Sequence, residues 1–152
     1  MVETDMKKIS ITTSCFNEES NLRELYERLM KVFQQLPQYN YEIIIADNCS
    51  TDGSRVILRE IAAKDQRFKV IFNSNNFGYL RSPHNAFLQA TGDAVIPMCS
   101  DLHDPPEVIL DMVRKWEEGN MVVVAVKPRT RESFPMALVR KLYYKLLSRM
   151  SD

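Results

Sequence analysis

Asp101 and His103, two side chains that can bind divalent cations, stand two residues apart in the second half of the chain. In an extended segment, side chains at this spacing point to the same side, so both could bind one cation. The alternative is that Asp101 closes a turn and His103 is a solvated loop residue. The spacing alone leaves both interpretations open.

Further polar side chains follow β-rich runs of the sequence. They lie at residues 14–19, 47–54, 73–78 and 99–104. In an open parallel sheet, ligands bind at the carboxyl ends of the strands, where these segments would meet. Carboxylates and hydroxyls gathered there suit a hard divalent cation and, through it, a phosphate group. Two of the acids also have simpler interpretations, because Asp47 could be a turn former and Asp52 a helix cap.

The other candidate ligands have weaker patterns. Cys15, Cys49 and Cys99 all fall at the ends of expected strands, and they would form a thiolate zinc site if they converged. Because they lack short paired spacing, buried or half-buried thiols are the favoured interpretation. His84 is expected on a helix surface. The chain has no GxGxxG, P-loop or GxSxG pattern, which argues against a Rossmann dinucleotide site, a P-loop and a serine nucleophile elbow.

Two periodicities alternate along the chain and define the expected elements. The β-rich runs occupy residues 9–13, 41–46, 68–72, 94–98 and 121–126. Between them, apolar residues recur at helical spacing, for example from Leu22 to Leu36 and from Val108 to Trp116. Strands that alternate with helices predict an α/β fold with a parallel sheet and right-handed crossovers.

Residues that start and stop helices agree with this pattern. Ser82-Pro83 predicts a helix start with proline at the first helical position. Asp104 and Glu107 have the spacing of an acidic capping box at the start of the next helix. Gly92 and Gly119 stand where helices should end in the left-handed conformation.

The last part of the chain has an apolar stripe of its own. From Phe134 to Met150, apolar residues recur at helical spacing with lysine and arginine among them. The simpler interpretation is a helix that packs on the sheet. The other is a helix that faces a membrane surface or a missing C-terminal part of the protein.

Composition narrows the class of protein. The chain has 152 residues, of which 45% are hydrophobic and 26% charged, which excludes a disordered or fibrous protein and fits about one domain. Twenty basic and twenty acidic residues cancel, which argues against a dedicated nucleic-acid binder. No apolar run approaches the roughly 20 residues that span a bilayer, and no signal peptide is recognisable. With three cysteines that fit reduced thiols, these features predict a cytoplasmic protein.

Five segments of the chain follow one another in the order of a known family. They read ISITTSCFNEE, YEIIIADNCSTDGS, NFG, ATGD and DLHDPPE. Together they resemble the family-2 glycosyltransferases of GT-A fold, and most of all the polyprenyl-phosphate enzymes similar to dolichyl-phosphate mannose synthase. The resemblance runs from about residue 8 to the end of the chain. It implies a mostly parallel sheet flanked by helices, in one GT-A catalytic domain over residues 1–152.

The resemblance also implies a ligand and a reaction. The donor would be a nucleotide-diphosphate sugar with Mn²⁺ or Mg²⁺ on its diphosphate, and the sugar carbon would be inverted. By position, the residues that bind the nucleotide sugar would be Ser14, Phe16, Glu18, Asp47, Asn76, Gly78 and Asp101. Phe16 offers a stacking face, and Asp47 offers an acceptor for the base or ribose. Asp101 matches the last acid of the family's D-x-D motif, is the expected catalytic residue, and would bind the metal together with His103.

Two departures from the family pattern bear on this expectation. Cys99 stands at the first acid of the D-x-D motif, which removes one hard ligand and one negative charge. Asp101 with His103 is then expected to suffice, because the substrate diphosphate holds much of the metal. The chain also stops before the region that usually supplies a general base. A polyprenyl phosphate would need none, because its phosphate is already an anionic nucleophile.

We therefore expect an inverting hexosyltransferase that transfers a sugar to a polyprenyl phosphate or another glycan in cell-envelope polysaccharide biosynthesis. The chain would be the N-terminal segment of a longer protein, cytoplasmic or at the inner face of the membrane. Arg129 and Arg131 would approach phosphate groups or form a solvated basic loop. The alternatives are a nucleotide-sugar-binding module without turnover and a phosphoacceptor domain in which Asp47 and Asp101 hold magnesium.

Overall fold

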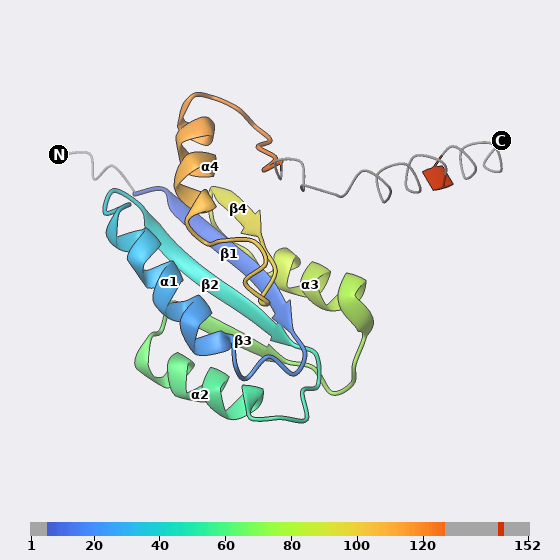
Figure 1. Ribbon diagram of the computed structural model, residues 1–152. Coiled ribbons are helices and arrows are strands. Elements are labelled where there is room, and N and C mark those ends of the chain that lie inside the picture. Colours follow the sequence, from blue (N-terminus) through green and yellow to red (C-terminus); the bar gives the residue numbers. More distant parts are fainter. Residues whose placement is uncertain (1–5, 127–142, 145–152) are drawn as a thin grey trace.

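The computed structural model describes residues 6–126 and 143–144, and it shows an α/β fold (Figure 1). In chain order the elements are β1 (Lys8–Cys15), α1 (Leu22–Gln34), β2 (Asn40–Asp47), α2 (Ser54–Lys64), β3 (Phe68–Phe72), α3 (Gly78–Leu88), β4 (Ala94–Pro97) and α4 (Val108–Glu117). The strands form one sheet in the order β3-β2-β1-β4, and every pair is parallel. The prediction of a parallel α/β fold is confirmed, and the loops that follow the strands meet at one edge.

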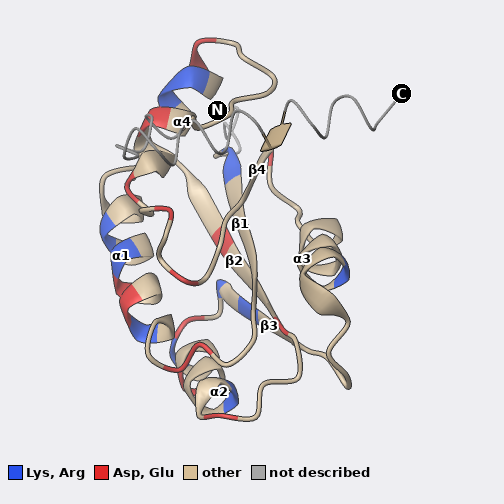
Figure 2. Ribbon diagram, turned by 45° about the vertical axis from the view of Figure 1, so that its right-hand side comes forward, with Lys and Arg blue, Asp and Glu red and all other residues tan. Residues whose placement is uncertain are grey.

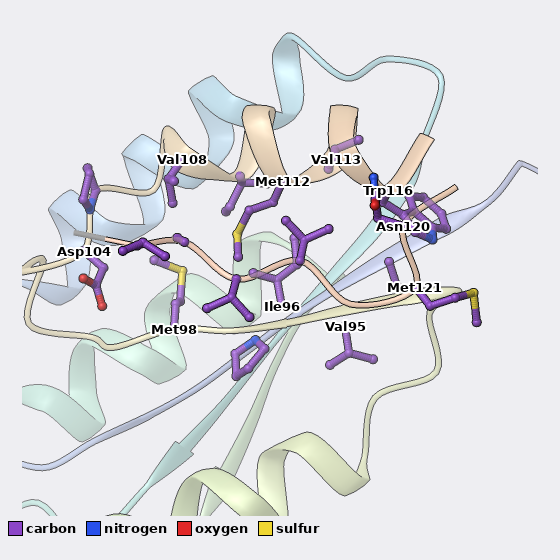
Figure 3. A pocket seen from close by; sticks show the side chains of 18 of the residues that line it. Val95, Ile96, Met98, Asp104, Val108, Met112, Val113, Trp116, Asn120 and Met121 are labelled. Carbon is purple, nitrogen blue, oxygen red and sulfur yellow. The ribbon is translucent and has the colours of Figure 1, made fainter. Parts of the chain in front are cut away.

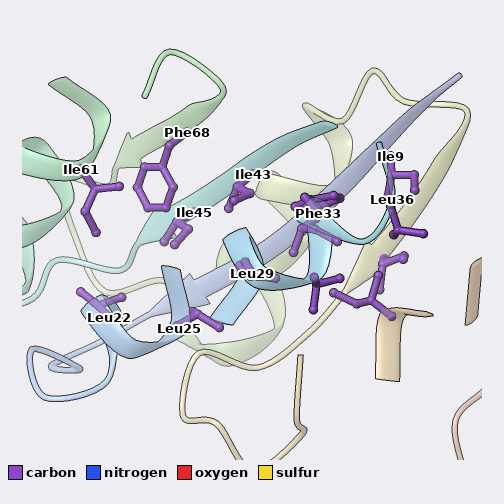
Figure 4. Close-up of a cluster of buried hydrophobic side chains, with 14 of the residues drawn as sticks. Ile9, Leu22, Leu25, Leu29, Phe33, Leu36, Ile43, Ile45, Ile61 and Phe68 are labelled. Carbon is purple, nitrogen blue, oxygen red and sulfur yellow. The ribbon is translucent and has the colours of Figure 1, made fainter. Parts of the chain in front are cut away.

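Helices cover both faces of the sheet. On one face, α1, α2 and α4 pack on Ile43 and Ile45 of β2 and on the neighbouring β1 (Figure 4). On the other face, Ile44 and Ala46 contact Ala86 of α3. A strand that is covered on both sides has no solvent face, which explains why residues 43–46 are apolar without alternation.

A buried carboxylate joins three strands at their amino ends. Glu42 of β2 is 2% exposed and accepts hydrogen bonds from Ser10 Oγ of β1 at 2.6 Å and from Lys69 Nζ of β3 at 2.6 Å. The backbone N–H and the hydroxyl of Thr91 donate to the same carboxylate at 2.7 and 2.9 Å. Burial alone would raise the pKa of Glu42, but these hydrogen bonds, with that from Lys69 the largest, lower it to about 2.

The expected fifth strand over residues 121–126 is not a strand in the structure. The run pairs with no strand among the described residues, and Met121, Val122, Val124 and Val126 are between 74% and 93% exposed. β4 is an edge strand of the sheet. It pairs with β1 on one side, and no strand of the described residues lies on its other side. A β-rich sequence gains its stability from cross-strand contacts, and this run lies across a groove from β4 instead of beside it.

Three of the predicted helix signals are wrong, and each is overruled by tertiary contacts. Pro83 lies inside α3, which begins at Gly78, because Ser82 is buried and accepts a hydrogen bond from Asn73. Gly92 does not end a helix: a Cβ there would lie 2.7 Å from the Lys8 carbonyl oxygen, so it permits close approach to β1. At the start of α4 the Glu107 side chain pairs with Arg28, so it does not make its half of the expected capping box.

The fourth signal is confirmed. Gly119 follows the last turn of α4 with a φ of 95°, and its N–H donates to the Trp116 carbonyl. Asn120 N–H donates to the Lys115 carbonyl, which completes a Schellman motif. The apolar stripe predicted from Phe134 to Met150 lies outside the described residues, apart from the exposed Tyr143 and Tyr144.

Glu42→Gln should lower the free energy of unfolding at neutral pH by about 3 kcal/mol, because the carboxylate is favoured by roughly two to three pKa units in the fold. A lowered pKa contributes stability above the ordinary carboxyl range, and this contribution is lost as the pH falls toward about 2. Urea unfolding from pH 7 to pH 2 should therefore show the two proteins converging. Glu60→Gln, which removes an exposed partner of Arg23, should change little at any pH.

Candidate functional site

A cavity of about 630 Å³ lies at the carboxyl edge of the sheet, between β1, β4 and the start of α3. Its lining residues are Ser14, Cys15, Phe16, Glu18, Asn48, Asn76, Gly78, Tyr79, Pro83, Pro97, Met98, Cys99, Ser100, Asp101 and Asp104. Six of the predicted site residues meet there: Ser14, Phe16, Glu18, Asn76, Gly78 and Asp101. Asp47 and His103 are outside the lining. The cavity is the place where the structure gathers most of the predicted groups.

The loops after β1 and β2 hold each other in place by hydrogen bonds between side chains and backbone. Asn17 has a positive φ of 56°, and its Oδ1 accepts the N–H of Thr51 at 2.8 Å. In return Ser50 Oγ accepts the N–H of Asn17 at 3.0 Å, and Ser54 Oγ accepts the N–H of Glu18 at 2.9 Å. These bonds satisfy the backbone of a tight loop and fix where its side chains emerge.

The same pair of loops contains Asp52, which was expected to be a helix cap. Its carboxylate accepts the N–H of Ser54, the first residue of α2, at 3.0 Å and the N–H of Glu19 at 3.2 Å. Burial alone would raise the pKa of Asp52, but the hydrogen bonds, led by that from Ser54, lower it. The N-cap position of α2 is Gly53, so Asp52 orders the start of the helix from the residue before the N-cap and also holds the loop after β1.

Asp47 lies beneath the cavity floor and is fully buried. Its carboxylate accepts the N–H of Ser50 at 3.3 and 3.4 Å and lies 3.3 Å from Arg55 Nε. The Sγ of Cys15 donates to Asp47 at 3.9 Å. Burial, aided by the negative charge of Asp47, raises the pKa of the Cys15 thiol to about 12. The structure thus shows Asp47 as the acceptor that orders the turn after β2.

Asn48 is a site residue that the sequence analysis did not single out. It is 5% exposed, lines the cavity, and its Nδ2 donates to Asn76 Oδ1 at 2.7 Å. Its Oδ1 accepts the N–H of Phe77 at 2.8 Å and the Nδ2 of Asn73 at 3.3 Å. Asn73 also donates to Ser82 Oγ of α3 at 3.0 Å. The pattern in the sequence that indicates this role is the set of asparagines that follow two strands. A search for charged side chains does not detect it, because amides carry no charge.

Asp101 and His103 form a turn and not the extended pair that the spacing suggested. Leu102 between them has a φ of 60°, and Asp101 Oδ1 accepts the N–H of His103 at 3.1 Å. The His103 Nδ1 lies 2.8 Å from the other carboxylate oxygen, and this hydrogen bond lowers the pKa of Asp101. The turn is tied to β1 because Ser100 Oγ donates to the Ser14 carbonyl at 3.0 Å. The two side chains still meet, with His103 78% exposed.

The charges around the cavity are of one sign. Glu18, Asp101 and Asp104 line it, whereas no lysine or arginine of the described residues does. The first residue of α3 also lines the cavity, and this helix carries a single charged residue, Arg81. Figure 2, which colours charged residues blue or red, therefore shows α3 almost entirely in tan. Within residues 6–126, no three His, Cys, Asp or Glu side chains are grouped as a metal site. The described lining of the cavity is therefore acidic, with no basic side chain to offset its carboxylates.

The three cysteines do not come together. Cys15 is buried, Cys49 is half-buried and Cys99 is exposed, and none of the three forms a disulfide. The favoured interpretation as separate thiols is confirmed for Cys15 and Cys49. His84 is exposed on α3, where its ring stacks on Phe87 with centroids 6.5 Å apart, as expected for a helix-surface residue.

A second cavity, of about 590 Å³, lies between β4, α4 and residues 120–126 (Figure 3). Side chains such as Ile96, Met98, Met112 and Trp116 point into it, so its wall is mostly apolar. The acids in its lining are Asp93 and Asp104. Catalysis needs convergent polar groups, so the cavity at the carboxyl edge is the functional candidate.

Known proteins with similar sequences decide between the interpretations. The family model described as "Glycosyl transferase family 2" matches residues 10–151. The chain belongs to glycosyl transferase family 2. The resemblance inferred from the five motifs is thereby confirmed, and the phosphoacceptor alternative is wrong.

Two relatives show the extent of the sequence similarity. The chain is 40% identical over 144 residues to "Uncharacterized glycosyltransferase YkcC" of Bacillus subtilis, covering 94% of this chain and 44% of that protein. It is 35% identical over 146 residues to "Undecaprenyl-phosphate 4-deoxy-4-formamido-L-arabinose transferase" of Proteus mirabilis, covering 95% of this chain and 43% of that protein. The chain thus spans less than half the length of these relatives.

Solved structures confirm the GT-A fold. A mannosyltransferase of Pyrobaculum calidifontis, solved in complex with GDP-Man and Mn²⁺, superposes with a TM-score of 0.64 at 21% identity. The match covers 84% of this chain and 37% of that one. In the part of the chain that the structure describes, no helix has the length and apolarity to cross a bilayer.

Asp47→Asn should lower the free energy of unfolding by about 1–3 kcal/mol, because it removes the charge that faces the buried Nε of Arg55. Phe16→Ala should leave stability nearly unchanged, since Phe16 is 44% exposed at the cavity. Urea unfolding of both variants checks this contrast. An unchanged midpoint for Asp47→Asn, with loss of nucleotide affinity only, would assign Asp47 to ligand binding instead.

Proposed function

We propose that this chain is the donor-binding catalytic part of an inverting glycosyltransferase that transfers a hexose from a nucleotide-diphosphate sugar to a polyprenyl phosphate. The observation that carries the proposal is the cavity at the carboxyl edge, where Phe16, Asn48 and three carboxylates meet in a chain of glycosyl transferase family 2. An aromatic face, amide groups and carboxylates suit a base, a ribose and a metal-bound diphosphate, respectively.

The donor would lie across the loops that follow β1 and β2. Phe16 stacks on the base, while Ser14 and Glu18 face the ribose and Asp47 supports the loop from beneath or accepts a base N–H. On the opposite wall, Asn76 and Gly78 border the diphosphate and sugar. The bonds between the loops fix these groups before the ligand arrives, which reduces the ordering cost of binding.

The residues present fit a divalent cation that is shared with the substrate. Asp101 and Asp104 line the cavity, and His103 contacts Asp101 at its edge. Asp101 and His103 would hold Mn²⁺ or Mg²⁺, and the diphosphate oxygens would complete its coordination. When bound, the cation would neutralise charge on the leaving diphosphate. The Pyrobaculum mannosyltransferase, with GDP-Man and Mn²⁺ in its structure, supports this assignment.

The choice of a lipid phosphate as the acceptor follows from the question of which residue could act as a general base. The acids among the lining residues are Glu18, Asp101 and Asp104, and this proposal assigns all three to the donor and its cation, which leaves none of them as a general base for the acceptor. A lipid phosphate brings its own anionic oxygen and needs no deprotonation before it attacks the sugar carbon. The Proteus mirabilis relative is named for transfer to undecaprenyl phosphate, which supports this acceptor class. The full-length protein would work at the inner face of the membrane.

Metal and nucleotide should bind cooperatively. Mn²⁺ alone should bind weakly because few protein ligands are grouped, and saturating UDP or GDP should tighten it by roughly tenfold or more. Linkage requires Mn²⁺ to tighten the nucleotide by the same factor, so calorimetry in both orders is an internal check. His103→Ala should reduce the coupling, with His84→Ala on the surface of α3 as the control. Binding of neither UDP nor GDP in the presence of Mn²⁺ would contradict the proposed function.

Cys99→Asp should strengthen Mn²⁺ binding in the absence of nucleotide, because it adds a hard ligand beside Asp101 at the cavity wall. Cys99→Ser should change little, because a thiol contributes weakly to a site of hard oxygen ligands. Titration of both variants with Mn²⁺ makes the comparison. Loss of Mn²⁺ binding in Cys99→Ser, with binding retained in His103→Ala, would point to a thiolate-centred site.

A nucleotide-sugar-binding module without turnover is the second candidate. Cys99 at the cavity wall favours it, because the missing acid lowers the negative charge available for a metal. Both candidates predict cooperative binding of Mn²⁺ and nucleotide. Transfer of labelled sugar to undecaprenyl phosphate by the full-length protein separates them, since only the enzyme gives product.

A further inference from the structure

The start of α3 is capped by asparagine side chains within the proposed donor cavity. Asn76 Oδ1 accepts the N–H of Gly78, the first residue of α3, at 2.9 Å. Asn48 Oδ1 accepts the N–H of Phe77 at 2.8 Å, and its Nδ2 donates to Asn76 Oδ1 at 2.7 Å. Two backbone N–H groups at this helix end are therefore occupied by neutral amide oxygens.

A carboxylate would serve equally well as a cap at this position. Aspartate and asparagine are similar as helix caps, and a negative charge at a helix N-terminus is stabilised by the helix dipole. At position 76, an aspartate could accept both of the hydrogen bonds that Asn76 Oδ1 accepts now. The fold alone therefore gives no preference for asparagine over aspartate.

The charge of the proposed ligand explains why asparagine would be preferred to aspartate at position 76. Glu18, Asp101 and Asp104 already line the same cavity, and no described lysine or arginine does. A diphosphate that enters the cavity would meet three carboxylates among the described lining residues, and the cation it carries would offset part of their charge. Asn76 lines this cavity, so an aspartate there would add a fourth carboxylate to the same lining, and like charges within one cavity repel.

We propose that Asn76, held by Asn48, is a specificity-determining residue: it caps α3 without charge, so that the wall of the cavity accepts an anionic diphosphate. This inference rests on the proposed function, because the donor is taken to be a nucleotide diphosphate. Asn76 would then not only line the cavity but also need to be uncharged. Asn48 is the positioning residue, since its amide orients the Asn76 oxygen toward Gly78.

Asn76→Asp should separate stability from affinity. The thermal midpoint should stay the same or rise, because both hydrogen bonds persist and the new charge lies at a helix N-terminus. Affinity for UDP or GDP at saturating Mn²⁺ should fall on the order of tenfold, whereas affinity for uridine or guanosine should remain. The loss should shrink as the salt concentration rises, because screening weakens the repulsion.

Two further variants complete the test. Asn75→Asp adds the same charge one residue earlier, at an exposed position outside the cavity lining, and should cost clearly less affinity. Asn76→Ser keeps a neutral cap and should affect nucleoside and nucleoside diphosphate alike. Equal losses for both ligands in Asn76→Asp, or diphosphate binding that is unchanged or tighter, would overturn the inference. Failure of the unchanged protein to bind either ligand would instead refute the proposed function.

Discussion

The parallel pairing of β1 with β2 is the constraint on which the rest of the structure depends. The pairing runs without interruption from Lys8 opposite Asn40 to Cys15 opposite Asp47. Because both strands end at the same level, the loops after them emerge side by side and cross-link through Asn17, Ser50 and Ser54. A shift of one residue would turn the apolar side chains of β2 toward the wrong helices and separate these loops. The cavity wall that carries Phe16 and Glu18 therefore depends on strand register.

The two ends of the sheet use buried polar groups in opposite ways. At the amino ends, Glu42 is saturated by a lysine and two hydroxyl-bearing residues, and its charge is compensated within the protein. At the carboxyl ends, Glu18 and Asp101 line a cavity that has no lysine or arginine among the described residues. A carboxylate that is compensated within the protein stabilises the fold, whereas carboxylates that line a cavity are available to a ligand. This difference distinguishes the structural end of the sheet from the functional end.

The start of α3 connects these electrostatics to the fold. Asn48, Asn73 and Ser82 are buried, and their hydrogen bonds tie α3 to the ends of β2 and β3. This anchoring allows Pro83 to lie within the helix and Gly78 to begin it with a φ of 81°. The outcome is a hydrogen-bonded, uncharged part of the lining in the same cavity as the carboxylates. A charged network could hold the same helix, but it would change which ligands the cavity accepts.

The sequence by itself determined the order of strands and helices, the family, and the edge at which the polar segments gather, because these depend on local periodicity and on motifs. The tertiary structure alone decided that Asp47 is buried against Arg55, that Asn48 supports the cavity wall, and that residues 121–126 have no strand to pair with. It also replaced the extended pair of Asp101 and His103 by a turn. Such outcomes depend on hydrogen bonds and neighbours far apart in the chain, and residue spacing contains no record of them.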